Sequence, residues 1–285
     1  MTRISIRSKT LLSVFAVAAM SAPTIAKEAG SPDLLAFAAG GRVLEHPDFP
    51  AISSMSAGPL NLIDDSAATD WEGEAGESVF VFELAETTEI HGFAFDTAGL
   101  NRDTKSAKDF VVEVSETSAT KGFSEVMGGT LKMAKNGQSF FFKPEERPTA
   151  QWVRLTILNN YGDDYTAFTG FHAYGKQLTQ KATMPDLTGK YMGANGWGRL
   201  NITDSDEAVA GCYAYQQGEF NGVVAGRGLK IKMHQRADDQ MLDGLFQLMD
   251  SGELVGLVRN EGKSNLAFYA TYYSAEKESG KPNSC

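Results

Sequence analysis

Residues 159–165, with the sequence Asn-Asn-Tyr-Gly-Asp-Asp-Tyr, combine side-chain types that suit a binding site for a polar ligand. Their amide and carboxylate groups can hydrogen-bond hydroxyls, and the two tyrosines can pack on the apolar face of a sugar ring. The stretch 100–105 adds further polar groups if it faces the same end of the fold. A plain polar turn, with Asn and Asp supplying turn geometry, is the alternative. The candidate ligand-binding residues are Asn159, Asn160, Tyr161, Asp163, Asp164, Tyr165, Arg102 and Asp103.

The chain lacks the spacings of the common catalytic and zinc motifs. Its four histidines, His46, His91, His172 and His234, are scattered, without an H-E-x-x-H or H-x-H pattern. It has no G-x-S-x-G elbow and no P-loop. Paired carboxylates are frequent in so acidic a chain, so they do not define a glycosidase acid and base. We therefore expect no catalytic residues and no enzyme; a hydrolase site assembled across the fold remains the alternative.

Cys212 and Cys285 are the only two cysteines. In an oxidising compartment such a pair forms a disulfide more often than a metal or catalytic site. Closing that loop would add about 4 kcal/mol to the free energy of unfolding on the chain-entropy model, and it would tie the C-terminus to a strand. Two free thiols are the alternative.

The first 26 residues have the features of a secretory signal peptide. Arg3, Arg7 and Lys9 form a positive region, Leu11 to Met20 form a short apolar run, and Ala26 is a small residue suited to cleavage. The apolar run has only about half of the roughly 20 residues that a membrane-spanning helix needs. We therefore expect cleavage after Ala26, no transmembrane anchor and a periplasmic or secreted protein.

Removing this leader makes the chain strongly acidic. Lys plus Arg falls from 26 to 23 against 36 Asp plus Glu, so the net charge changes from −10 to −13. Such a surface repels phosphate backbones, which argues against a nucleic acid partner. Solubility is the simplest meaning of this charge.

Period-2 patterns dominate the first half of the chain, as in a β-sandwich or barrel. The expected strands, rich in β-branched and aromatic residues, are 78–84, 89–95, 109–115, 139–143 and 151–158. Their apolar positions alternate with polar ones and are expected to face one core. These core residues are Trp71, Phe80, Phe82, Leu84, Phe93, Phe95, Trp152, Val153 and Leu155.

A polar stretch without aromatic residues, 177–186, separates two halves of different texture. It predicts a sandwich domain over 33–176, a linker over 177–186 and a second domain over 187–285. The second domain has short apolar runs separated by Gly-containing turns such as Asp243-Gly244. Short connections make neighbouring strands antiparallel, and about seven or eight of them can close into a small barrel. The predicted fold class is therefore all-β.

Five blocks in the first half resemble, in order, the motifs of discoidin domains, also called coagulation factor 5/8 type C domains. Leu62–Trp71 is similar to their "DG-x-x-x-T-x-W" segment, and Phe80–Leu84 to the strand that follows it. Phe110–Ser115 is similar to "F-x-V-x-x-S", Ala150–Leu155 to "A-R-Y-V-R-L", and Phe171–Gly175 to "I-x-V-Y-G". The resemblance implies a galactose-binding-like jelly roll whose end loops bind sugars, lipid head groups or proteins.

The same resemblance implies a structural calcium ion near one loop, held by Asp64, Asp65 and Thr69. Two departures weaken it. Gly170 stands where the family usually has a glutamate ligand, and Asp65 replaces the usual glycine of the "DG" turn. Calcium takes six to eight oxygen ligands, so the loss of a carboxylate weakens binding. We expect no other cofactor.

The second half resembles, more loosely, a glycine-rich meander of secreted bacterial proteins, as in Val209–Tyr213 and Gly218–Gly222. This likeness concerns architecture and not a ligand. The hypothesis for the whole chain is an exported, non-catalytic protein that binds a glycan or another cell-surface ligand through the end loops of the sandwich. The alternative is a structural or protein-interaction role in the cell envelope, with envelope proteins as partners and no glycan binding.

Overall fold

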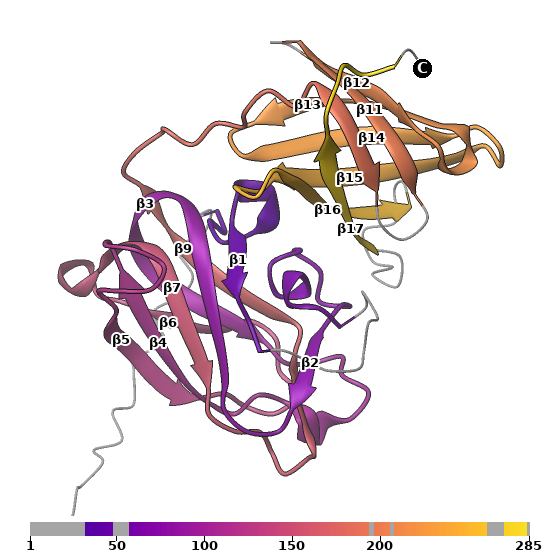
Figure 1. The fold of residues 1–285 in the computed structure, drawn as a ribbon. Helices are drawn as coiled ribbons and strands as arrows, with labels where there is room; N and C mark the ends of the chain where they lie inside the picture. The colour runs from indigo at the N-terminus through magenta and orange to yellow at the C-terminus, as the bar shows by residue number, and fades with distance from the viewer. Residues whose placement is uncertain (1–31, 48–56, 194–196, 206–207, 261–270, 284–285) are drawn as a thin grey trace, which may run out of the picture.

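The computed structural model describes residues 32–47, 57–193, 197–205, 208–260 and 271–283. The predicted signal peptide lies outside the described residues, so its cleavage stays a prediction. None of the helices in the part of the chain described here is both long and apolar enough to cross a membrane. The described chain is almost entirely β-structure, which confirms the predicted fold class (Figure 1).

The first half is a sandwich organised around one long strand, β3 (Ser78–Asp96). The sheet runs in the order β1–β3–β7–β4–β5, with β6 and β9 also paired to β3. The partner strands are β1 (Arg42–Glu45), β4 (Asp109–Ser115), β5 (Ser124–Thr130), β6 (Gln138–Phe141), β7 (Thr149–Ile157) and β9 (Gly170–Gln177). A separate two-stranded sheet joins β2 (Trp71–Glu74) to β8 (Tyr165–Phe168).

Strand β3 merges the two strands that were predicted over 78–84 and 89–95. The connecting residues 85–88 contain no Gly or Pro that would turn the chain, so the strand continues. The register against β7 shifts between Glu83 and Thr88, where the strand changes partners. Its first part pairs with β1 and β7 and its second part with β6 and β9, so a single strand links the two layers.

Aromatic residues that alternation predicted for the core are buried in the sandwich: Trp71, Phe80, Phe82, Phe93 and Phe95. Trp71 packs edge-on against Phe80 with ring centroids 4.7 Å apart, and Phe93 stacks on Phe171 at 5.6 Å. The prediction was wrong for Trp152, which is only partly buried. Trp152 and Val153 are consecutive in one strand and must point to opposite faces, and Val153 takes the core side.

The second half is a closed antiparallel barrel in which each strand pairs with the next and the last pairs with the first. Its strands are β10 (Gly189–Gly193), β11 (Gly198–Ser205), β12 (Ala208–Tyr213), β13 (Gly218–Ala225), β14 (Gly228–Gln235), β15 (Gln240–Leu248), β16 (Glu253–Asn260) and β17 (Thr271–Glu278). Closure pairs the edges that an open meander would expose. This confirms the predicted meander and its closure.

Glycines on the barrel strands make room for the aromatic ring of Phe246. A Cβ added at Gly256 would lie 2.2 Å from Phe246 Cδ1, and one at Gly244 would lie 2.8 Å from its Cε2. Real Cβ atoms do not approach so closely, so side chains at these positions would displace the ring. The recurring glycines of the second half are therefore packing positions as well as turn signals.

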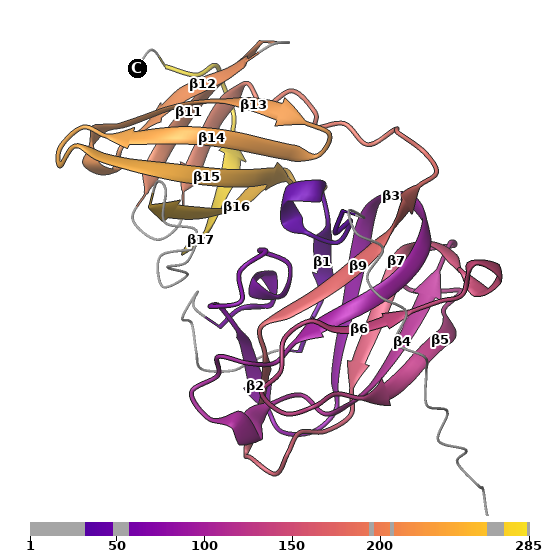
Figure 2. The ribbon, with the colours of Figure 1, turned by 180° about the vertical axis from the view of Figure 1, so that it is seen from behind.

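Figure 1 and Figure 2 show the barrel over one end of the sandwich, with η1 (Phe37–Ala39) and β1 next to it. The connection that follows β7 lies at the other end of the sandwich in both views, as does η3 (Asp103–Lys105). The candidate binding loops are thus carried on the end that the barrel does not cover.

Candidate functional site

The two loops proposed from the sequence are joined to each other. The backbone N–H of Tyr161 donates to the carbonyl of Thr104 at 3.1 Å, and the Thr104 hydroxyl donates to Asp163 Oδ2 at 2.9 Å. Arg102 Nη2 lies 3.1 Å from Asp163 Oδ1. Burial alone would raise the pKa of Asp163, but the hydrogen bond from Thr104 and the Arg102 charge hold that pKa below its ordinary value. The charged side chain of Asp163 therefore links the two loops.

Asn160 builds the loop rather than facing a ligand. Its side-chain amide donates to the carbonyls of Asp163, at 2.9 Å, and Tyr165, at 2.7 Å. Its Oδ1 accepts from the backbone N–H groups of Gly162 at 2.7 Å and Asp163 at 3.1 Å. Gly162 has φ of +97°, a left-handed conformation that glycine adopts without strain. Asn160 therefore stabilises the turn, as in the alternative interpretation of this stretch.

Both tyrosines of the loop are held in place. The Tyr161 hydroxyl donates to the carbonyl of Leu131 at 2.5 Å, and the ammonium of Lys108 lies 5.6 Å from the ring centre. The ammonium of Lys105 lies 5.2 Å from the ring centre of Tyr165. Both distances fall in the range of cation–π contacts. Tyr161 is half-buried and presents a fixed ring at the loop end.

Lys105 is a residue of this region that sequence reasoning missed. It is 3% exposed, and its Nζ lies 2.5 Å from Glu72 Oε2 on β2. Nearby, burial and then the Glu72 charge raise the pKa of Asp70. The signal was absent from the sequence because Glu72 is 33 residues away and only the fold brings the pair together. The buried Lys105 side chain therefore contacts both the Tyr165 ring and Glu72 on β2.

The remaining predicted residues divide into one fixed and three exposed groups. Asn159 exchanges hydrogen bonds with Asp109, donating to Oδ2 at 2.9 Å and accepting from its N–H at 3.2 Å. Hydrogen bonds from Thr130 and Asn159 hold the pKa of Asp109 below its ordinary value. Asp103 and Asp164 are exposed residues, and the Arg102 side chain is 53% exposed. Arg102, Asp103 and Asp164 are therefore the charged groups that face solvent at this end.

The residues suggested for calcium do not fit a calcium site. Asp64 uses one carboxylate oxygen to accept from the Thr69 hydroxyl at 2.7 Å and the other to accept from the Ser66 N–H at 2.9 Å. Burial raises the pKa of Asp64 to about 7, so the carboxyl is partly neutral near pH 7. Asp65 is exposed, with φ of +62°. Within the described ranges, no group of three or more His, Cys, Asp or Glu side chains could hold a metal ion.

Gly170, at the position where the resembling family has a glutamate, lies against a different charged cluster. A Cβ at Gly170 would lie 2.9 Å from His172 Nε2 and 3.3 Å from Asp96 Oδ2. His172 Nδ1 contacts Asp33 Oδ2 at 2.7 Å, and its Nε2 contacts Asp96 Oδ2 at 3.2 Å. The space of the missing carboxylate is thus taken by an ion triad that fixes the segment around Asp33 to β9 and β3.

Cys212 lies on β12, whereas Cys285 lies outside the described residues, so the predicted disulfide stays a prediction. The last described residues approach β11, the neighbour of β12 in the barrel. The N–H of Asn283 donates to Asn201 Oδ1 at 2.9 Å, and Asn201 is the register partner of Cys212. The last described residues therefore lie beside the strand that pairs with β12.

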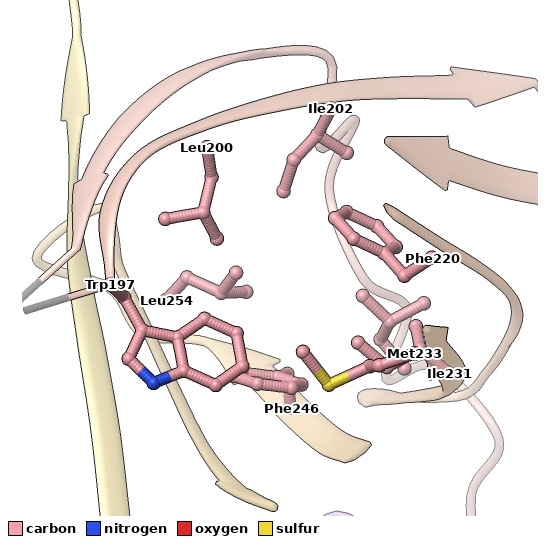
Figure 3. A pocket seen from close by; sticks show the side chains of 9 residues that line it. Trp197, Leu200, Ile202, Phe220, Ile231, Met233, Phe246 and Leu254 are labelled. Atoms are coloured by element: carbon pink, nitrogen blue, oxygen red, sulfur yellow. The ribbon is translucent and has the colours of Figure 1, made fainter. Parts of the chain in front are cut away.

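A pocket inside the barrel is lined by apolar side chains (Figure 3). Its free space is about 10 Å³, which is about enough for the centre of one water molecule. Its lining residues are Trp197, Leu200, Ile202, Phe220, Leu229, Ile231, Met233, Phe246 and Leu254. Among the described residues, the side chains that line this pocket leave room for about one water molecule.

Comparisons with known proteins agree with the fold of the first half. The family model described as "Sad1 / UNC-like C-terminal" matches residues 67–177, which is less than half of the chain. A search of curated proteins found no matching relative. The match falls on the segment that resembles discoidin domains, and the sandwich confirms that resemblance at the level of the fold.

Several solved structures are similar to about half of this chain. A putative chitobiase fragment from Bacteroides thetaiotaomicron has 16% sequence identity and covers 55% of this chain and 100% of its own, with a TM-score of 0.47. A CBM32 domain from Clostridium perfringens, solved in complex with GalNAc-β-1,3-galactose, has 15% identity and covers 50% and 99%, with a TM-score of 0.42. A chitosan-binding module from Paenibacillus has 17% identity and covers 50% and 99%, with a TM-score of 0.40. At these identities the likeness says nothing of the ligand.

Proposed function

We propose that this protein is an exported, non-catalytic binding protein that recognises a carbohydrate at the loop end of its sandwich. The observation that carries the proposal is the joining of the loops 100–105 and 159–165 by Asp163. A fixed site needs little ordering when a ligand binds, so more of the contact energy becomes affinity.

The chemistry of the exposed surface suits a polyhydroxylated ligand. The Lys108 ammonium lies over one face of the Tyr161 ring, and the opposite face of this ring would supply the apolar surface. The hydrogen bond from the Tyr161 hydroxyl to the Leu131 carbonyl holds the ring in place. Arg102, Asp103 and Asp164 supply charged hydrogen-bonding groups around it.

A glycan array followed by isothermal titration of the best ligand tests the proposal. Replacing Tyr161 with alanine removes the stacking surface, worth about 1.5 kcal/mol, and should weaken binding at least about tenfold. Arg102→Ala should also weaken binding, because it removes a charged group of the site and the ion pair with Asp163 that helps to join the two loops. Tyr215→Ala is the matched control, because Tyr215 is 45% exposed on the barrel.

Two results would contradict the proposal. One is an absence of binding to any glycan at millimolar concentration, which would favour the envelope structural or protein-interaction role. The other is a bound glycan whose affinity is lowered equally by Tyr161→Ala and by the Tyr215→Ala control, since binding would then lie elsewhere.

A further inference from the structure

The outer face of the barrel takes part in the core of the sandwich. Val255 and Leu257 on β16 are 3% and 8% exposed and belong to the same apolar cluster as the sandwich core. Their neighbours Leu254 and Val258 belong to the barrel core. Successive residues of a strand point to opposite faces, so β16 is buried on both sides. The apolar run of this strand thus serves two cores at once.

A buried polar network joins the same two parts. Arg42 on β1 is 6% exposed and donates from Nε to Gln247 Oε1 at 3.2 Å and from Nη2 to the Leu248 carbonyl at 2.8 Å. Gln247 on β15 is fully buried, and its amide donates to the carbonyls of Phe37 at 2.9 Å and Gly41 at 3.0 Å. If the two parts separated, these groups would exchange protein partners for water and the network would be lost.

Two carboxylates of β3 complete the attachment. Glu83 Oε2 lies 2.6 Å from Arg227 Nη1 of the barrel and 3.8 Å from Arg42 Nη1. Glu86 accepts hydrogen bonds from the backbone N–H groups of Lys181 at 2.6 Å and Ala182 at 2.5 Å. The segment between β9 and β10 is therefore bonded to the sandwich rather than free.

From this shared core and the network around Arg42, we infer that the sandwich and the barrel form one rigid body that unfolds as a single unit. Domains joined by small polar interfaces move relative to each other, whereas a large apolar interface prevents that motion. The barrel is then a permanent support that covers one end of the sandwich and leaves the loop end exposed. This inference does not depend on what the loops bind.

Differential scanning calorimetry of the full chain tests the inference. We expect one transition whose calorimetric and van't Hoff enthalpies agree. Arg42→Met should lower the midpoint of that transition by about 6 °C or more without splitting it. The matched control is Arg199→Met, because Arg199 is 49% exposed and pairs with Glu278 at 3.1 Å within the barrel. The control should shift the midpoint by about 2 °C or less.

A second measurement covers the case in which Arg42→Met does not fold. A protease site inserted after Met184 allows the linker to be cut in a chain that is otherwise wild type. We expect the two fragments to elute together in gel filtration. Two separate transitions in the wild-type chain, equal shifts for Arg42→Met and Arg199→Met, or separation of the cut fragments would each overturn the inference.

Discussion

The triad of Asp33, His172 and Asp96 predicts a specific dependence of stability on pH. Burial alone would lower the pKa of His172, but the hydrogen bonds and charges of Asp33 and Asp96 outweigh burial and raise the pKa to about 10. The imidazolium is thus the form that suits the folded state. Glutamine in its place has one amide group and cannot donate to both carboxylates with a positive charge.

The magnitude follows from the pKa difference. A histidine with an ordinary pKa of 6.5 that rises to about 10 favours the folded state by roughly 5 kcal/mol at 1.36 kcal/mol per pKa unit. Removing one partner of a buried ion pair costs about 3–5 kcal/mol, which is a similar figure. Because the folded pKa is raised, this stabilisation is complete below pH 6.5 and is lost as the pH rises toward 10.

Urea denaturation followed by far-ultraviolet circular dichroism at pH 6, 7, 8, 9 and 10 measures the effect. His172→Gln should lower the free energy of unfolding by about 3–5 kcal/mol at pH 6 and by about 1 kcal/mol at pH 10. The control His46→Gln changes an exposed histidine and should match wild type throughout. A difference between wild type and His172→Gln that stays constant from pH 6 to pH 10 would refute the reasoning.

Three further predictions concern stability. Asp64→Asn should abolish the fall in the free energy of unfolding that this carboxyl causes between pH 4 and pH 7. In the folded wild type its pKa is raised to about 7 and it stays protonated there, whereas in the unfolded chain it ionises; titrating both proteins in urea shows this. Gly211→Ala places a Cβ 2.2 Å from a strand carbonyl and should cost about 2 kcal/mol or more in thermal unfolding, whereas Gly58→Ala meets open space and should cost less than about 0.5 kcal/mol. Mass spectrometry of unreduced peptides should find Cys212 linked to Cys285, and Cys285→Ser should lower the free energy of unfolding by about 3–4 kcal/mol; unlinked peptides from the oxidised protein would contradict this.

Alternation of apolar and polar residues predicted β3, β4, β6 and β7 and part of the aromatic core of the sandwich. It did not place Phe37, Phe110, Phe168 or Phe171 among the core residues, although all four are buried. It failed where two predictions competed for one strand, as with Trp152 and Val153, since consecutive residues cannot both face the same core. Alternation also predicted two strands, 78–84 and 89–95, where the structure has the single strand β3, because a polar stretch interrupts the apolar pattern. The chain between them carries Glu86 and Thr88, which are polar and yet buried.

The sequence indicated the two loops of the candidate site. It did not indicate which side chains in them face solvent and which hold the loops together. Residue type placed Asn160 and Asp163 among the ligand-binding candidates, whereas the structure uses them to build and join the loops. Lys105 and Glu72 were missed because their contact depends on how β2 lies under the loop. Local sequence shows which groups are present, and only tertiary contacts show which of them are already occupied.

The association of the two halves lay beyond sequence reasoning. The polar stretch 177–186 separates two halves of different sequence composition, but composition does not show that the outer face of β16 packs against the sandwich. The continuous apolar run Leu254–Val258 is typical of a strand that is buried on both faces. A barrel strand with one face in water would instead alternate between apolar and polar residues.

We propose that the end loops of the sandwich bind a carbohydrate ligand. The most direct measurement is a ¹H–¹⁵N nuclear magnetic resonance titration of the full chain with the glycan selected on the array. We expect the perturbed amides to cluster in residues 100–105 and 159–165. The Tyr161 amide should show one of the largest chemical-shift changes. Perturbations confined to the barrel, or to the sandwich end beneath it, would contradict the claim.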